Sequence, residues 1–201
     1  MTLAQLINVL YNIVDRIYIG RLEQGNALEL TGLGVCLPVI SIIIAFANLI
    51  GMGGAPLFSI QRGKKDDEEA AGILGNCFVM LLLCGVFLTV VIMAVKKPVL
   101  YLLGASDQTY VYADAYLTIY LFGTVFVMLS LGLNQFINAQ GFGTTGMLTI
   151  VIGAGLNIVL DPVFIYGLHM GVRGAAVATV ISQFISAVWT LRFLLGKRAV
   201  V

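Results

Sequence analysis

Long apolar stretches, separated by short polar or glycine-rich breaks, run through the whole chain. A helix of about 20 apolar residues crosses the hydrocarbon core of a bilayer, which is about 30 Å thick. Six stretches meet that standard, and no alternating strand pattern competes with them. The expected spans are residues 3–20, 33–60, 70–95, 115–140, 147–168 and 174–191. The pattern predicts an all-α polytopic membrane protein, with residues 1–201 forming one lobe of six transmembrane helices.

The breaks between these stretches are of several kinds. Residues 62–69 (RGKKDDEE) are expected to form a solvated loop, with the acids at the start of the third helix, where they suit its dipole. Residues 99–113 are expected to form a longer connection that lies partly on the membrane interface. The uncharged stretch 115–160 is too long for one span, and the glycine-rich residues 141–146 divide it.

Composition narrows the class of protein further. Hydrophobic residues make up 60% of the chain and charged residues only 10%, whereas soluble domains carry about 25% charged residues. The net charge is +1 and no polybasic tract is present, so nucleic acid is not an expected partner, whereas the lipid bilayer is. The cysteines Cys36, Cys77 and Cys84 lie in apolar segments without metal-ligand spacing, so we expect neither a bound metal nor a cofactor at them.

One carboxylate stands out because it lies inside an apolar segment. Asp161 is followed directly by Pro162, and Asn157 precedes it by one helical turn, so Asn157 and Asp161 share a helix face. The next segment carries Thr179. A charge at membrane depth is costly and by default marks a functional site. The alternative is an aspartate at a loop end, near the lipid headgroups.

The first segment carries a second polar face. Its polar residues, spaced i, i+3, i+4, i+7, are Asn8, Tyr11, Asn12 and Asp15. We expect an internal cavity to join polar groups of comparable depth, namely Asp15, Asn134, Asn157 and Asp161, with Thr179 able to join them. A carboxylate there would be desolvated, which favours its neutral form and suits a proton carrier. The same oxygens could instead hold a hard monovalent cation such as Na⁺, and the asparagines could simply link helices by hydrogen bonds.

Pro162 has a structural consequence of its own. Proline removes a backbone hydrogen bond, so it is expected to bend the fifth segment beside the carboxylate. A kink without function is the alternative, because prolines are common in membrane helices.

Four stretches of the sequence resemble one known family. They are LYNIVDRIYIG (residues 10–20), GMGGAPLFSIQRGKKDDEEA (51–70), NAQGFGTTG (138–146) and LNIVLDPVFIYG followed by GVRGAAVATVISQ (156–183). Through them the chain resembles the multidrug and toxic compound extrusion (MATE) transporters, in the prokaryotic branch. The resemblance covers essentially the whole chain, but only the first of the family's two six-helix lobes.

The resemblance implies a fold and an activity. Such proteins have twelve helices in two lobes of the bacterial plasma membrane, and they export cationic, amphipathic compounds by alternating access coupled to inward H⁺ or Na⁺ movement. On this interpretation the chain is a half-length piece, and the C-terminal lobe that it lacks is an expected partner.

The resemblance also implies a site. The first-lobe cation site of such proteins corresponds here to Asp15, Asn157 and Asp161, and positions matching Asn134 and Thr179 complete it in some members. Tyr11 matches a cavity position, and Asn8 lies one turn before it on the same helix face. The proline that bends helix one in some relatives would precede Met1.

Three other functions remain as alternatives. A lipid-linked oligosaccharide flippase shares the lobe plan, but cavity arginines would favour it, and no arginine lies well inside a span. A truncated membrane protein that only makes interactions is another. An intramembrane aspartyl protease would use two aspartates, but Asp161 lies in Leu-Asp-Pro rather than in a Gly-x-Gly-Asp context. We therefore expect a transporter rather than an enzyme.

Overall fold

The computed structural model describes residues 26–196, and every regular element within that range is helical. The elements are α2 (Asn26–Gly63), α3 (Asp67–Leu102), α4 (Asp107–Phe122), α5 (Thr124–Ala139), α6 (Gly143–Pro162), the π-helix η1 (Val163–Gly167) and α7 (Val172–Leu194). The predicted all-α fold is confirmed for this range. The expected first span, residues 3–20, lies outside the described residues.

The connection between α2 and α3 is shorter than the expected loop of residues 62–69. Only residues 64–66 lie outside the two helices. Asp66 caps α3, because its Oδ1 accepts a hydrogen bond of 3.0 Å from the backbone N–H of Glu69. The acids at residues 67–69 occupy the first turn of α3, where negative charge suits the helix dipole. Their placement at the start of this helix agrees with the sequence prediction.

The far end of α3 also extends beyond its expected limit at residue 95, and the connection expected at 99–113 is largely helical. The helix continues through Pro98 to Leu102. Its last turns are held against α4 by an ion pair of 2.8 Å between Lys96 and Asp114. Helix α4 starts at Asp107 because Ser106 and Thr109 form a reciprocal capping box. Most of the connection that was predicted for residues 99–113 is therefore helical, as part of α3 or α4.

The fourth expected span, residues 115–140, is not one continuous helix. Helices α4 and α5 meet at Gly123 with a bend of 57°. A Cβ atom at Gly123 would lie 2.6 Å from a methyl carbon of Val180 on α7, so only glycine permits this close approach. The expected span over residues 115–140 thus corresponds to a bent pair of helices that together are long and apolar enough for one span. The predicted break at residues 141–146 is present, since α5 ends at Ala139 and α6 starts at Gly143.

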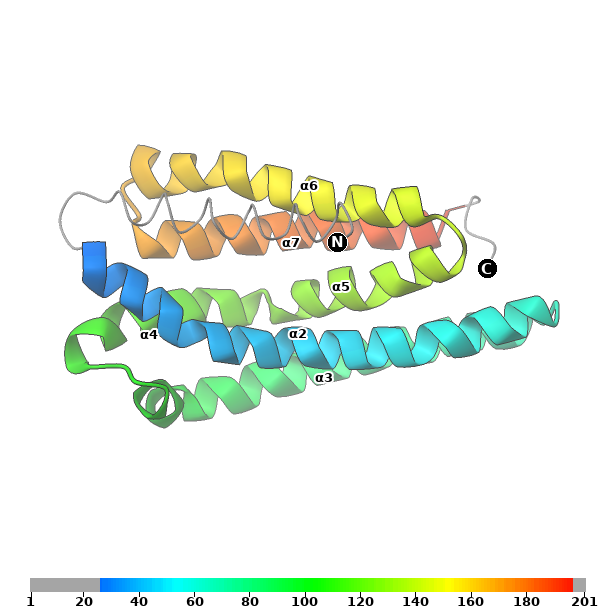
Figure 1. Cartoon of the computed structure of the whole chain (residues 1–201), viewed down its shortest axis with the longest axis horizontal. Helices are drawn as coiled ribbons and strands as arrows, with labels where there is room; N and C mark the ends of the chain where they lie inside the picture. Colours follow the sequence, from blue (N-terminus) through cyan, green and yellow to red (C-terminus); the bar gives the residue numbers. More distant parts are fainter. Residues whose placement is uncertain (1–25, 197–201) are drawn as a thin grey trace.

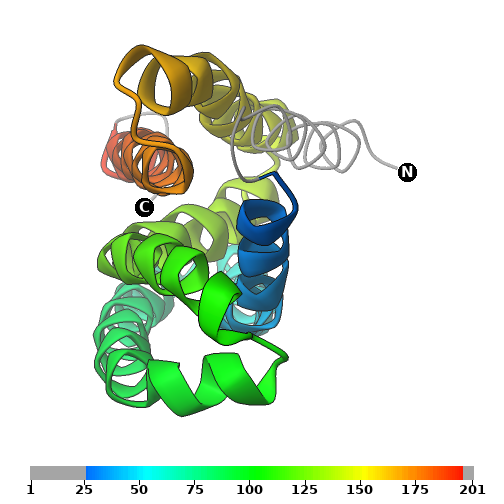
Figure 2. The same ribbon diagram turned by 90° about the vertical axis from the view of Figure 1, so that its left-hand side faces the viewer.

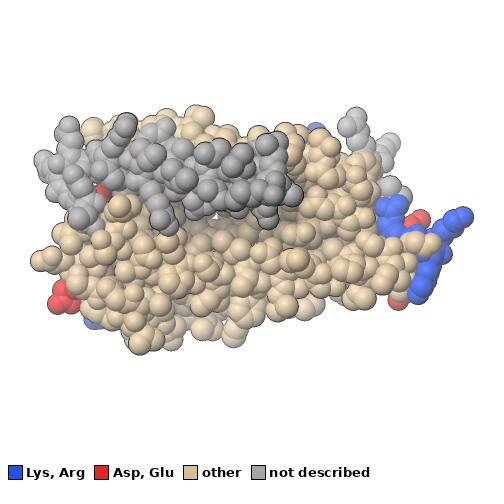
Figure 3. All heavy atoms as spheres, in the orientation of Figure 1, with Lys and Arg blue, Asp and Glu red and all other residues tan. Residues whose placement is uncertain are grey.

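The described helices are long and apolar enough to cross a bilayer. Four of them meet that standard by themselves, and the bent pair α4–α5 makes up to five within residues 26–196. Large apolar side chains lie on the outside, such as Leu49 at 68% exposure and Leu83 at 66%. Figure 3 shows Lys and Arg gathered at the tip of the α2–α3 hairpin, and the described residues visible along the middle of the molecule are largely uncharged. These features mark a multi-pass membrane protein.

The helices form two groups that meet at α5. Helices α2 and α3 pack on each other and on α5, and α6 and α7 form a hairpin whose α7 also contacts α5 (Figures 1 and 2). The first group has an apolar core, in which the rings of Phe58 and Phe136 meet edge to face at 5.5 Å. Helix α5 therefore presents one side to a packed apolar core and the other to the α6–α7 hairpin.

Candidate functional site

Asp161 is fully buried, with 0% of its surface exposed, in the last turn of α6. This places the carboxylate inside the helical bundle and not in a loop at the lipid headgroups, which was the alternative reading of the sequence. Asn157, one turn earlier, is 2% exposed, and Thr179 on α7 is 5% exposed. The three side chains that the sequence grouped around the fifth and sixth spans thus lie together at the α6–α7 contact.

A small hydrogen-bond network joins these three residues. The side-chain amide of Asn157 donates to Asp161 Oδ1 at 3.3 Å and to Thr179 Oγ1 at 3.4 Å. The Thr179 hydroxyl donates its own proton to the carbonyl of Ala175 at 2.9 Å, so it accepts from Asn157. Both bonds from Asn157 are long for N–H···O contacts and therefore weak. A single amide thus links the carboxylate on α6 to the hydroxyl on α7.

The backbone changes form directly after the carboxylate. Pro162 has no N–H with which to continue the α-helical ladder, and the π-helix η1 begins at the next residue. Its wider turn is closed by a hydrogen bond of 2.9 Å from the N–H of Leu168 to the carbonyl of Val163. Helix α7 starts against this turn, since a Cβ at Gly174 would lie 2.7 Å from the carbonyl of Phe164. Pro162 and Gly174 together set how closely the two helices approach beside Asp161.

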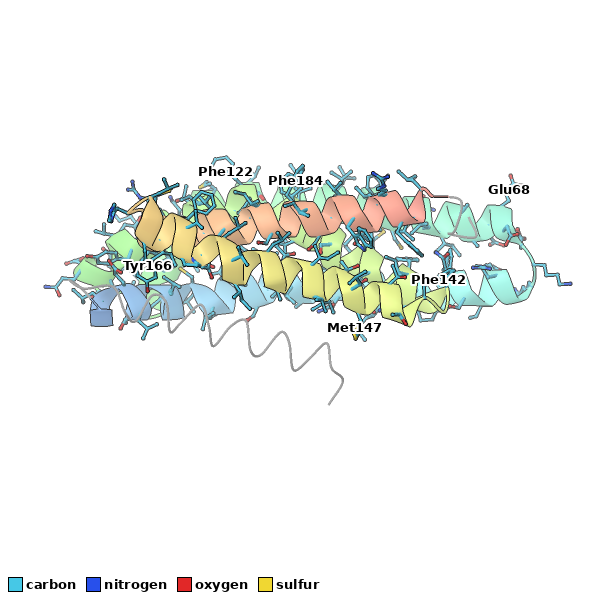
Figure 4. The ribbon with its side chains drawn as sticks, turned by 90° about the horizontal axis from the view of Figure 1, so that it is seen from above. Glu68, Phe122, Phe142, Met147, Tyr166 and Phe184 are labelled. Atoms are coloured by element: carbon cyan, nitrogen blue, oxygen red, sulfur yellow. The ribbon has the colours of Figure 1, made fainter. Side chains whose placement is uncertain are left out.

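A polar cavity of about 70 Å³ lies between α5, α6 and α7 and extends from Asn157 and Thr179 away from Asp161. That volume is room for about two water molecules. The residues that line the cavity are Ser130, Leu131, Asn134, Thr149, Ile150, Gly153, Ala154, Asn157, Thr179, Ser182, Gln183 and Ser186. Most of them are polar and none carries a charge. Figure 4 shows α6 and α7 side by side along this region, with Tyr166 at one end and Phe142 at the other.

Asn134 lines the same cavity but belongs to its other end. Its Oδ1 lies 3.3 Å from the point where a Cβ would stand at Gly146. Gly146 and Asn157 are about 16 Å apart along α6 by helical rise. The expectation that Asn134 lies at the depth of Asp161 is therefore wrong, because Asn134 lies near the α5–α6 connection and Asp161 lies at the opposite end of α6. The cavity connects Asn134 to the carboxylate network without a direct contact.

Several cavity residues were not predicted from the sequence. They are Ser130 on α5, Thr149 on α6, and Ser182, Gln183 and Ser186 on α7. A signal was present, because the polar residues of α7 follow the spacing of one helix face, i, i+3, i+4, i+7, starting from Thr179. Serine and threonine are also common where membrane helices simply pack together, so this spacing alone does not distinguish a cavity lining from ordinary helix packing.

Asp15, Tyr11 and Asn8, which the sequence assigned to the site and its cavity, lie outside the described residues. Their proximity to Asp161 therefore stays a prediction.

Comparisons with known proteins agree on one family. The MatE family model matches residues 1–163. The multidrug export protein MepA of Staphylococcus haemolyticus (strain JCSC1435) is 32% identical over 197 residues, which are 98% of this chain and 43% of MepA. MepA of Staphylococcus aureus (strain NCTC 8325 / PS 47) is 28% identical over 201 residues, 100% of this chain and 44% of that protein.

Solved structures give the same result. A crystal structure of MATE in the bent conformation superposes with a TM-score of 0.89 at 30% identity, covering 97% of this chain and 43% of that one. A MOP superfamily transporter from Pyrococcus furiosus Vc1 (DSM3638), described as having a binding pocket of reverse polarity, has a TM-score of 0.89 at 30% identity, with 97% and 42% covered. The chain spans about 43% of the length of the relatives that it matches.

The family model covers most of the chain, the helices are of membrane length, and the fold matches one lobe of the solved transporters. The chain therefore belongs to the MatE family, as a multi-pass protein of the bacterial plasma membrane whose fold matches one lobe of a MATE-type transporter.

Proposed function

We propose that the chain forms an ion-coupling half of a multidrug efflux antiporter. In this proposal H⁺ or Na⁺ enters at Asp161 and drives the export of cationic, amphipathic compounds by alternating access. The observation that carries the proposal is the complete burial of Asp161 in contact with Asn157, at the end of a polar cavity. Buried ionisable groups of membrane proteins commonly mark ion and substrate pathways. The MepA relatives, named as multidrug export proteins, support the substrate class.

Ion binding would act through the amide of Asn157. A hydrogen bond to an ionised carboxylate is roughly twice as strong as one between neutral groups, so protonating Asp161 weakens its bond from Asn157. Sodium would instead draw oxygens from Asp161, Asn157 and Thr179 toward itself, since it is a hard cation. Either event changes the link between α6 and α7 that Asn157 makes. Two-state repacking of this hairpin is the expected response.

The lining of the cavity supports an organic cation over a phosphate-bearing lipid. A flippase for lipid-linked oligosaccharides would require cationic side chains to hold a phosphate. The residues that line the cavity include no Arg or Lys, and most of them have neutral polar side chains. Efflux of organic cations therefore fits this half of the pathway better than lipid transfer does.

The test measures binding of ethidium, a fluorescent organic cation, to the 201-residue chain in lipid nanodiscs. Binding is chosen over transport because the chain spans about 43% of the length of its relatives. We expect higher Na⁺ concentration or lower pH to weaken ethidium binding by about tenfold, since ion and substrate would compete through one linked site. Titrating each ion separately distinguishes Na⁺ from H⁺ coupling.

The decisive variant is Asp161→Asn, which keeps the size of the side chain and removes its charge. It should bind ethidium with an affinity that responds to neither Na⁺ nor pH. Asp67→Asn is the matched control, because Asp67 lies exposed in the first turn of α3, and its response should equal that of the unmodified chain. An unchanged ion response in Asp161→Asn would remove this carboxylate from coupling.

A further inference from the structure

We infer that Val180, seated beside Gly123 at the α4–α5 bend, is a positioning residue that holds Thr179 of α7 within reach of the ion site. That site, made by Asn157, Thr179 and Asp161, belongs to the function proposed above, on which the inference rests. The inference depends on where Val180 lies, on the stiffness of its side chain, and on the length of the hydrogen bonds beside it.

Two consecutive residues of α7 face two different parts of the molecule. Thr179 and Val180 point about 100° apart around the helix. Thr179 faces α6, where its Oγ1 lies 3.4 Å from the side-chain nitrogen of Asn157. Val180 faces the bend, and its Cγ2, Cγ1 and Cβ lie 2.6, 3.0 and 3.2 Å from the point where a Cβ of Gly123 would stand. Because a helix moves as a rigid unit over one residue, any displacement of Val180 is carried to Thr179.

The side chain of Val180 is suited to transmit such a displacement. Its branched Cβ leaves one strongly preferred χ1 rotamer in a helix, whereas a longer and more flexible side chain would absorb the movement. One turn further along α7, the ring of Phe184 meets the ring of Phe126 edge to face, with centroids 5.0 Å apart. Phe126 lies three residues after Gly123, so α7 rests on this stretch at two points.

The start of α7 is held on the other side of the ion site. A Cβ at Gly174 would lie 2.7 Å from the carbonyl oxygen of Phe164 in η1. Thr179 therefore lies on α7 between two close contacts, one at Gly174 and one at Val180. These contacts fix the position of α7 beside Asp161.

The hydrogen bonds of the ion site respond to small changes in that position. The amide nitrogen of Asn157 lies 3.3 Å from Asp161 Oδ1 and 3.4 Å from Thr179 Oγ1. Protein N–H···O bonds are usually about 2.7–3.2 Å long, and a contact of about 3.6 Å is no longer a hydrogen bond. A shift of α7 by about 0.3 Å is thus enough to strengthen or break the bond to Thr179.

The test crowds this contact from the side of the bend, in the 201-residue chain in lipid nanodiscs. Gly123→Ala places a methyl group against Val180 and should displace α7. The ion response, which is the factor by which the coupling ion weakens ethidium binding, should fall from about tenfold to about twofold or less. The side-chain amide signals of Asn157 in the ¹⁵N NMR spectrum, identified by their absence in Asn157→Asp, should shift as well, because that amide makes the bond to Thr179.

A second variant makes the test independent of how well Gly123→Ala folds. Val180→Ala removes the two methyl carbons nearest to Gly123 and leaves a gap there, so it should also shift the amide signals and lower the ion response. In the double variant Gly123→Ala/Val180→Ala the added methyl group enters the space that is freed. We expect the double variant to recover at least about half of the ion response.

The matched control crowds a different contact of α5 to the same degree. A Cβ at Gly132 would lie 2.6 Å from a methyl carbon of Leu81 on α3, the same distance as at Gly123. Gly132→Ala should therefore lower stability, as Gly123→Ala does, but keep the ion response and the amide signals of Asn157. Circular dichroism of each variant verifies that it is folded.

An ion response and amide signals that stay unchanged in both Gly123→Ala and Val180→Ala would overturn the inference, and so would equal changes in Gly132→Ala. The proposed function would stand in either case, because the unmodified chain and Asp161→Asn decide it. An unmodified chain whose ethidium binding responds to neither ion would overturn the proposed function, and this inference with it.

Discussion

The two hairpins of this chain, α2–α3 and α6–α7, use their helices for different purposes. In α3 the buried residues are all apolar or small, from Ala70 to Leu100. In α7 the buried residues include Thr179, Ser182 and Ser186, which face a cavity shared with α5 and α6. The α2–α3 hairpin therefore packs as a scaffold, whereas the α6–α7 hairpin keeps polar groups and unfilled space at membrane depth.

The glycines of the two hairpins show the same contrast. A Cβ at Gly51 of α2 would lie 2.6 Å from the backbone carbonyl of Gly132, so this glycine brings two helix backbones together. On α6, a Cβ at Gly146 would meet the side-chain oxygen of Asn138, and one at Gly153 would meet the hydroxyl of Ser186. Glycine serves close packing in the first hairpin, and in the second it leaves room for polar side chains.

The largest expected effect tests the scaffold. Gly51→Ala places a methyl group against backbone atoms of Gly132, which cannot move without shifting a helix, so we expect a loss of about 2 kcal/mol or more in stability. Gly53→Ala, two residues away on the same helix, meets nothing within 4 Å and should leave stability unchanged. Thermal unfolding in detergent, followed by circular dichroism, compares the two. Equal melting temperatures would mean that α2 and α5 are not in close contact.

The sequence predicted the apolar spans and the Asn157–Asp161 pair well, because both depend on local spacing. Hydrophobic length determines a span, and an i, i+4 pair must share a helix face whatever surrounds it. Thr179 was expected only as a residue of the next segment that could join them, and it lies 3.4 Å from the amide nitrogen of Asn157. These features need no knowledge of distant contacts.

The sequence could not predict features that depend on contacts between distant helices. The bend at Gly123 has no proline or charge to mark it, and the close approach of Val180 there joins helices far apart in the sequence. Ser182 and Ser186 can be recognised as site residues only because they line the cavity.

A second variant pair tests the functional hairpin and should have a smaller effect on stability. Gly153→Ala brings a methyl group to 2.7 Å from Ser186 Oγ, a side-chain atom that can rotate away at the expense of the cavity. We expect ethidium binding to weaken about tenfold while stability changes by less than about 1 kcal/mol. Gly155→Ala, which meets nothing within 4 Å, is the control on the same helix.

The reverse pattern for Gly153→Ala, a large loss of stability with binding intact, would place it with the scaffold glycines. The contrast between the hairpins would then disappear, because glycine would serve close packing in both. Fluorescence titration and thermal unfolding on the same preparations separate these outcomes.

The smallest expected effect concerns the one ion pair seen in residues 26–196. Lys96 contacts Asp114 at 2.8 Å and donates to Thr118 at 2.7 Å, and the two charged side chains are 21% and 31% exposed. Such partly exposed pairs contribute about 0.5–1 kcal/mol, so Lys96→Met should lower stability by about that amount. Lys97→Met, at the next and exposed position, should have no effect on stability.

Cation binding should be unchanged in both variants, because the pair links α3 to α4 and lies outside the cavity lining. A loss of ethidium binding in Lys96→Met alone would show that the α2–α3 hairpin affects the cavity, and that the two hairpins are not as separate as their packing indicates.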